Sequence, residues 1–126
     1  MSTQTATILH NTAVDPEGRS LAFFRGYQDQ HPMAVVFRAD LPSGLPTAKA
    51  LEVLFEEFNI GETSQAAVAY RQVHGLRSLS VGDVVGIADT WWACANNGWE
   101  RLEKAPLIAL HAAPRTWSTT ERWELP

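Results

Sequence analysis

A short segment of the chain carries side chains from which a nucleophilic site could be built. Ser78 and Ser80 offer hydroxyls, Asp83 offers a carboxylate, and His74 lies just before them. A serine becomes a nucleophile when a base within hydrogen-bond reach takes its proton and an acidic residue orients that base. One hypothesis from this spacing is therefore an enzyme that acts through His74, Ser78 and Asp83.

A turn explains the same side chains without any reaction. Ser80 and Asp83 lie on either side of Gly82, and short polar side chains beside a glycine commonly hydrogen-bond the backbone amides of a turn. Turns of this kind are common at the entry to a strand. We therefore favour a structural role for Ser78, Ser80, Gly82 and Asp83, and we predict no catalytic residue.

The histidines and the cysteine lack the spacing of a metal site. No histidine has a histidine, cysteine or acidic residue at i+3 or i+4 within a predicted helix; the four are His10, His31, His74 and His111. We therefore predict no metal and no cofactor. His31 precedes Pro32 and is predicted to lie exposed in a turn. Cys94 lies in a predicted strand with no cation beside it, which favours a buried, unreactive thiol.

Tryptophan is the most unusual feature of the composition. All five tryptophans follow residue 90: Trp91, Trp92, Trp99, Trp117 and Trp123. Neighbours on a strand point to opposite faces, so of Trp91 and Trp92 one enters the core and the other lies at the surface or under another element. Because exposed tryptophans anchor many interfaces, we predict binding through Trp92, Trp117 and Trp123. The alternative, that the C-terminal segment folds back and covers them, stays open.

Charge favours a protein partner over a nucleic acid. The formal net charge is -4, whereas a surface that binds phosphates needs a basic excess. Glu52 and Glu56 lie on the polar side of a predicted helix, either as a solvated face or as an acidic patch for a basic partner. Arg71 and Arg77 near an aromatic residue keep a nucleic-acid-binding or nucleotide-binding domain as an alternative.

Length and composition indicate one globular domain in the cytoplasm. The chain has 126 residues, 45% of them hydrophobic and 19% charged, which suffices for one core without disulfides. Its start lacks the basic and apolar stretches of a secretory signal. No segment approaches the roughly 20 apolar residues that cross a bilayer, so we predict no membrane partner. The single cysteine also fits a reducing compartment.

Hydrophobic periodicity predicts a helix and strands in the first half. Residues 5–10 and 33–39 are predicted strands, and residues 21–27 a strand end or bend. A helix is predicted to begin near Thr47, which would be its N-cap, and to end where Asn59 and Gly61 supply a stop signal. Its core-facing stripe has the spacing i, i+3, i+4, i+7 and consists of Leu51, Leu54, Phe55 and Phe58.

The second half is predicted to be a series of hairpins. Residues 83–88 and 91–95 form the first, with a turn at Asp89 and Thr90. Asn97 and Gly98 then supply a strong turn signal, so residues 99–102 form a third strand and residues 107–112 add another.

Three segments in a fixed order resemble the YodL-like domain, a small domain of bacteria and their plasmids and phages. These are residues 51–59, an acidic helix that ends in Phe-Asn; residues 77–85, with the run Ser-Leu-Ser-Val-Gly-Asp-Val-Val; and Trp92 to Cys94, leading to Gly98 and Trp99. The resemblance covers about the second half of the chain, and residues 10–12 and 23–27 are similar to actinobacterial versions. It implies an accessory protein of a host or mobile element, and it implies no reaction. We assign the motif residues Gly98 and Trp99 a structural role, like the residues around Gly82.

These observations give one fold and one leading function. We predict an α+β fold: a mainly antiparallel sheet of about five strands packed against one principal amphipathic helix. Residues 1–126 form a single YodL-like domain, in which residues 114–126 are a tail that is either flexible or docked. The predicted function is a non-enzymatic protein-interaction module, accessory or regulatory. The alternatives are the nucleic-acid- or nucleotide-binding domain and the enzyme described above.

Overall fold

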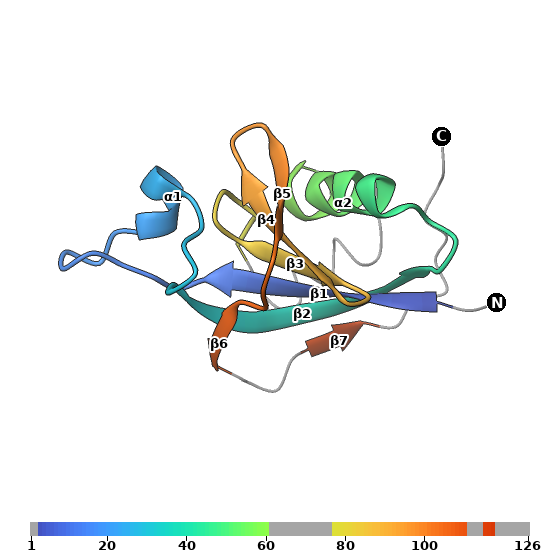
Figure 1. The fold of residues 1–126 in the computed structure, drawn as a ribbon, viewed down its shortest axis with the longest axis horizontal. Coiled ribbons are helices and arrows are strands. Elements are labelled where there is room, and N and C mark those ends of the chain that lie inside the picture. The colour runs from blue at the N-terminus through green and yellow to red at the C-terminus, as the bar shows by residue number, and fades with distance from the viewer. Residues whose placement is uncertain (1–2, 61–76, 111–114, 118–126) are drawn as a thin grey trace.

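The structure, a computed structural model, describes residues 3–60, 77–110 and 115–117 (Figure 1). In chain order its elements are β1 (Thr3–Asn11), α1 (Leu21–Arg25), β2 (Pro32–Pro42), α2 (Thr47–Phe55), a π-helical turn η1 (Glu56–Ile60), β3 (Val84–Ile87), β4 (Thr90–Ala95), β5 (Gly98–Leu102), β6 (Leu107–Leu110) and β7 (Arg115–Trp117). The fold is α+β and mostly sheet, as the sequence predicts.

The sheet has more strands than predicted, and not all of them are antiparallel. The strands β5, β4, β3, β1 and β2 lie side by side in that order and pair antiparallel. β6 and β7 then both pair parallel with β2, β6 near Pro32–Ala34 and β7 near Phe37–Ala39. The prediction of about five antiparallel strands is therefore incomplete: β2 is long enough to hold two further short strands, one after the other, along its second edge.

A β-bulge in β2 determines which side chains face which core. Leu9 pairs with Val35 and the preceding Ile8 pairs with Phe37, so Val36 is an extra residue in the ladder. Side chains alternate along a strand, and one extra residue shifts that alternation by one position. As a result Phe37 faces one core cluster, whereas Val35 faces the other.

The two clusters lie on opposite faces of the sheet. The larger is covered by α2, whose Leu51 and Leu54 pack on strand residues that include Ile8 and Val85. The smaller contains Leu9, Met33, Val35, Val84 and Ala93, with Trp91 packed against it. Each buried side chain of this size contributes about 1.5–3 kcal/mol to folding, so both faces stabilise the sheet.

The principal helix is confirmed, but its start and its end differ in detail. α2 buries Ala50, Leu51 and Leu54, as the apolar stripe predicts. The N-cap position is Pro46, and no side chain caps the helix, so the prediction that Thr47 is the N-cap is wrong. The chain passes directly from α2 into η1, where Phe58 continues the buried stripe.

Residues 21–27, predicted as a strand end or bend, begin instead with the short helix α1. Gly26 explains this helix: its amide donates to the carbonyl of Ala22 at 2.8 Å, and its φ is 76°. A glycine with positive φ just after the last turn is a common way to end a helix, and the apolar run before it hid that signal.

The predicted hairpins are present. β3 and β4 pair antiparallel from Val84 with Ala93 to Ile87 with Thr90, so their turn lies one residue earlier than predicted. β4 and β5 pair from Trp91 with Leu102 to Ala95 with Gly98, where the Asn-Gly signal placed the turn. No helix in the described part of the chain is long and apolar enough to cross a membrane.

Candidate functional site

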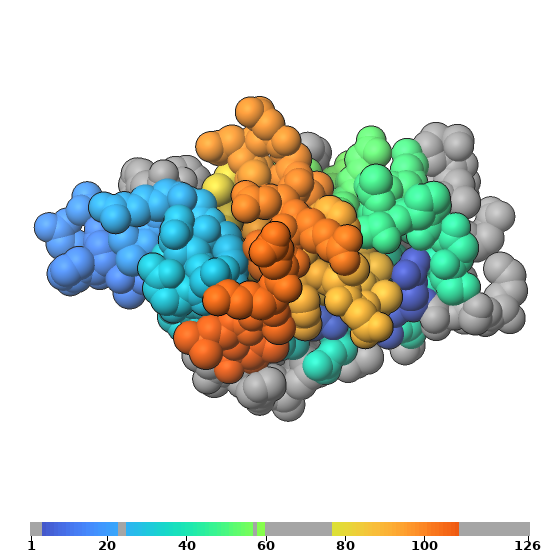
Figure 2. Space-filling view, in the orientation of Figure 1, coloured from blue at the N-terminus to red at the C-terminus, as the bar shows by residue number. Residues whose placement is uncertain are grey.

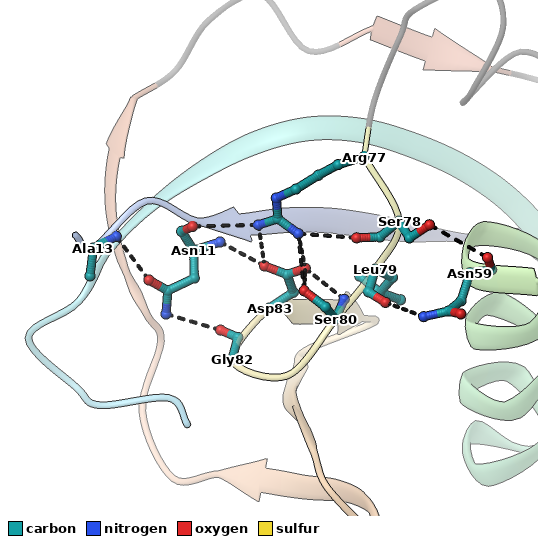
Figure 3. Close-up of polar contacts among 9 residues, drawn as sticks. All are labelled: Asn11, Ala13, Asn59, Arg77, Ser78, Leu79, Ser80, Gly82 and Asp83. Atoms are coloured by element: carbon teal, nitrogen blue, oxygen red, sulfur yellow. Dashed lines mark hydrogen bonds and ion pairs between the residues drawn. The ribbon is translucent and has the colours of Figure 1, made fainter. Parts of the chain in front are cut away.

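Asp83 is fully buried, and both of its carboxylate oxygens are engaged (Figure 3). Oδ1 accepts hydrogen bonds from the backbone amide of Asn11 and from Nη2 of Arg77, both at 2.8 Å. Oδ2 accepts from Nη1 of Arg77 at 2.6 Å and from the backbone amide of Ser80 at 2.9 Å. The pair with Arg77 is bidentate, the strongest geometry for an ion pair of this type. We call these four residues the Asp83 network.

The Asp83 network joins parts of the chain that are distant in sequence. Arg77 is 46% exposed and also donates to the carbonyls of Ser78 and Asn11, at 3.0 and 3.4 Å. Beside it, the Leu79 amide donates to the carbonyl of Phe58 at 3.0 Å, so the segment is also attached to the end of the helical layer. The network therefore ties the end of β1 and the last helical turn to the entry of β3.

Gly82 lies at the closest approach in this region. It is the third residue of a turn in which the Asp83 amide donates to the Ser80 carbonyl at 3.0 Å, and its φ is 92°, as in a type II turn. A Cβ on Gly82 would lie 2.2 Å from Cβ of Ala22 in α1. Only glycine satisfies both the backbone angle and the contact.

This geometry leaves Asp83 no capacity to orient a catalytic base. A carboxylate has about four lone-pair sites, and four donors within 2.9 Å already fill them. The Ser78 hydroxyl donates to the carbonyl of Asn59 at 3.5 Å. His74 lies outside the described residues. The hydrogen bonds that were predicted between Asp83 and backbone amides are present.

Two histidines beside the network are buried. His31 is 5% exposed, so its prediction as an exposed turn residue is wrong. The turn folds back onto the end of β1: the Thr12 amide donates to the Pro32 carbonyl at 2.9 Å, and Nδ2 of Asn11 lies 3.1 Å from Nδ1 of His31. His10 is 7% exposed, and burial lowers its pKa to about 4, an effect that Asp83 opposes and Arg77 reinforces.

An apolar groove lies between α2 and the β4–β5 hairpin. In Figure 2 this hairpin stands between α1 and α2 on the face shown. The cavity has a volume of about 300 Å³ and is lined by Ala48, Glu52, Phe55, Cys94, Ala95, Asn96, Gly98 and Trp99. The rings of Phe55 and Trp99 meet edge to face, with centroids 6.3 Å apart. We call this cavity the α2 groove.

The structure places the predicted binding residues in different surroundings. Trp91 and Trp92 face opposite clusters, as predicted, and both are half-buried. Trp92 donates from Nε1 to the Thr90 hydroxyl at 2.9 Å, and the guanidinium carbon of Arg101 lies 6.0 Å from its ring centroid. It is not among the residues that line the groove. Trp117 belongs to β7, but its side chain lies outside the described part, as does all of Trp123.

The groove adds residues that sequence reasoning assigned elsewhere. Of the predicted binding residues Glu52 lines it, and Glu56 is exposed one helical turn farther along. Phe55 was assigned to the core stripe and Trp99 to a structural motif. The spacing of Ala48, Glu52 and Phe55 at i, i+4 and i+7 could have indicated a shared edge of the helix.

Cys94 forms part of the groove wall but is poorly suited to reaction. It is 4% exposed, and burial, followed by the nearby charge of Asp83, raises the pKa of its thiol to about 11. The thiolate is the reactive form of cysteine, and a raised pKa keeps the thiol protonated. The low exposure of Cys94 confirms the prediction of a buried thiol. Among residues 3–60, 77–110 and 115–117, no three His, Cys, Asp or Glu side chains are grouped for a metal ion.

Comparisons of the chain with protein-family models, with curated proteins and with solved structures found no match. The resemblance to the YodL-like domain therefore rests on the sequence motifs, and the function rests on the geometry of the groove and of the Asp83 network.

Proposed function

We propose that this chain is a non-enzymatic protein-interaction module that binds a peptide segment of a partner protein in the α2 groove. The observation that carries the proposal is an apolar cavity whose lining includes two aromatic rings in edge-to-face contact and the carboxylate-bearing Glu52. We further propose that the module is a YodL-like accessory protein of a bacterium, plasmid or phage and acts in the cytoplasm.

The groove walls suit one apolar side chain of a partner. Phe55 and Trp99 are large, and their edge-to-face contact limits their movement. Rigid aromatic walls lose little entropy on binding, which is why such side chains dominate the energy of many interfaces. A volume of about 300 Å³ accommodates one aliphatic or aromatic side chain with part of its backbone.

The carboxylate of Glu52 at the border of the groove favours a basic residue next to the apolar side chain of the partner. Glu52 is 71% exposed, and its ion pair with Lys49 is long, at 3.8 Å. An exposed pair of that kind contributes at most about 1 kcal/mol, so a partner cation can replace Lys49 at small cost. We therefore specify the occupant as a segment with an apolar side chain flanked by lysine or arginine.

The other functions fit the geometry less well. An enzyme that used Asp83 would first have to break its hydrogen bonds to Arg77 and to two backbone amides. A nucleic acid would bring phosphates to a border that carries Glu52, with Glu56 nearby. Neither objection applies to a basic peptide.

The test uses a library of random peptides displayed on phage and selected against the whole chain. We expect enriched peptides to share an apolar residue within a few positions of lysine or arginine. Synthetic versions should bind with micromolar affinity, and Ala48→Arg should weaken them at least about tenfold through bulk and like charge. Ala48 is exposed on α2, so this variant keeps the fold.

Matched controls separate the groove from general charge effects. Glu52→Gln should weaken binding severalfold, whereas Glu17→Gln, which removes an equally exposed, ion-paired carboxylate, should not. Ala105→Arg adds the same side chain at an exposed position outside the groove and should leave binding unchanged. Equal affinities for Ala48→Arg and Ala105→Arg, or no shared pattern among the selected peptides, would refute the proposal.

A further inference from the structure

A second cavity shares no lining residue with the α2 groove. It has a volume of about 510 Å³, is open to solvent on one side, and is lined by residues of α1, of the loops on either side of it and of the start of β2. Its polar side chains are Arg25, Gln28, Gln30 and His31, and its apolar wall includes Val14 and Leu21. Cavities of this volume hold small organic molecules.

Hydrogen bonds fix which nitrogen of His31 carries the proton. Nδ1 faces two donors: the backbone amide of Gln28 at 3.2 Å and Nδ2 of Asn11 at 3.1 Å. An amide N–H can only donate, so Nδ1 must be the acceptor, and the neutral ring carries its proton on Nε2. Burial also lowers the pKa of His31, which keeps the ring neutral at physiological pH.

The remaining nitrogen is a buried donor that lacks an acceptor in the described structure. His31 is 95% buried, counted from its 5% exposure, and it lines the cavity. Among the described residues no hydrogen bond from Nε2 is found. Solvent in the open cavity can accept from this N–H, and an oxygen of a bound ligand would take the place of that water.

Arg25 supplies the charge that such an acceptor would complement. It is exposed at the end of α1 and lines the same cavity. No carboxylate is among the described residues that line it, and none lies within ion-pair distance of Arg25 in that part of the chain. The lining thus combines a guanidinium, an imidazole N–H and carboxamides without a carboxylate, and Asp29, between Gln28 and Gln30 in the sequence, is ion-paired with Lys104 at 3.5 Å.

The apolar wall determines what kind of anion fits. Val14 is 56% exposed, unusually high for a large hydrophobic side chain of this structure, and it borders the cavity with Leu21. A hydrated inorganic anion gains nothing from such a wall, whereas an organic group attached to a carboxylate covers it. We propose that this cavity is a binding site for a small organic carboxylate, whose oxygens accept hydrogen bonds from Arg25 and from Nε2 of His31.

The experiment titrates the isotopically labelled whole chain with sodium benzoate and follows the Arg25 side chain and the His31 ring by NMR. We expect saturable shifts at both residues with a Kd in the millimolar range. Benzamide, which has the same shape without the charge, should bind at least about tenfold more weakly, because bonds to ionised acceptors are about twice as strong. Inorganic phosphate should bind more weakly than benzoate.

Variants and the tautomer provide the decisive outcomes. Arg25→Gln should weaken benzoate about tenfold, whereas Arg101→Gln, which removes an exposed cation of β5 outside the cavity lining, should not. Long-range proton–nitrogen correlations should find the His31 proton on Nε2 before any ligand is added. A proton on Nδ1, equal binding of benzamide and benzoate, tighter binding of phosphate, or an unchanged Kd in Arg25→Gln would each overturn the proposal.

Discussion

Replacing Asp83 with asparagine should destabilise the fold strongly, although the two side chains have the same shape. Asparagine keeps one carbonyl oxygen but turns an NH2 group toward donors. Whichever way it is oriented, its NH2 group faces one guanidinium nitrogen of Arg77 and one backbone amide, that of Asn11 or that of Ser80. At least two of the four hydrogen bonds are therefore lost.

The magnitude follows from the burial of the groups that are left behind. Asp83 is 0% exposed, and a lost hydrogen bond to a charged group costs about 1.5–3 kcal/mol. Arg77 is 46% exposed and can recover part of its hydration, which reduces the loss on its side. We expect Asp83→Asn to lower the free energy of unfolding by about 2–4 kcal/mol, which for a domain of this size is a fall in Tm of about 10 °C.

The assay is urea unfolding of the wild type, Asp83→Asn, Arg77→Ala and the double variant. The loss in the double variant should be smaller than the sum of the single losses by at least about 1 kcal/mol, because the residues contact each other. Asp29→Asn is the matched control: Asp29 pairs with Lys104 at 3.5 Å, and both side chains are more than half exposed. It should cost less than about 0.5 kcal/mol.

Two results would refute this reasoning about the Asp83 network. One is a loss in Asp83→Asn no larger than in Asp29→Asn. The other is additivity of Asp83→Asn and Arg77→Ala within about 0.3 kcal/mol, which is the behaviour of independent sites. If Asp83→Asn melted normally but lost a measured function, the segment would be a functional site and not a structural one.

The remaining predictions concern groups that burial keeps uncharged. Because the pKa of His10 falls from 6.5 to about 4 on folding, the unfolded chain binds the proton more readily, and stability is lost as pH falls from 6.5 toward 4. Urea unfolding should register a loss of about 3 kcal/mol over that interval, and His10→Gln should remove most of it. Cys94, with its pKa raised from 9.0 to about 11, should react with iodoacetamide at pH 8 at least about 100-fold more slowly in the native chain than in urea; equal rates would contradict its burial.

The sequence predicted the elements that are specified by patterns among neighbouring residues. The stripe that includes Leu51 and Leu54 forms a helix because its spacing matches the helical turn. Gly98 accepts a positive φ of 106° at the hairpin, where the Asn-Gly pair placed a turn. Both signals depend only on residues within a few positions of one another.

The features that could not be predicted from the sequence depend on contacts between segments that are distant in the chain. β7 lies in a stretch that shows no apolar alternation, and it becomes a strand by pairing with Phe37–Ala39 of β2. Arg77 offered a cation for nucleic acid in the sequence, yet its guanidinium is held by Asp83 and the carbonyl of Asn11. The α2 groove likewise exists only because the hairpin stands beside α2, and no spacing within either element specifies that distance.

The extra residue in β2 has a consequence for insertions and deletions during evolution. Before and after Val36 the side chains alternate in opposite phase. Val35 and Phe37 therefore point to different faces of the sheet, although they are two positions apart. Deleting Val36 would make Val35 and Phe37 neighbours that already face opposite sides, so a regular ladder would keep the other residues in their present environments. Loss of a regularly paired residue such as Ala39 would instead exchange the faces of the residues on one side of the deletion, whereas the exposed turn before Gly98 can gain or lose residues freely.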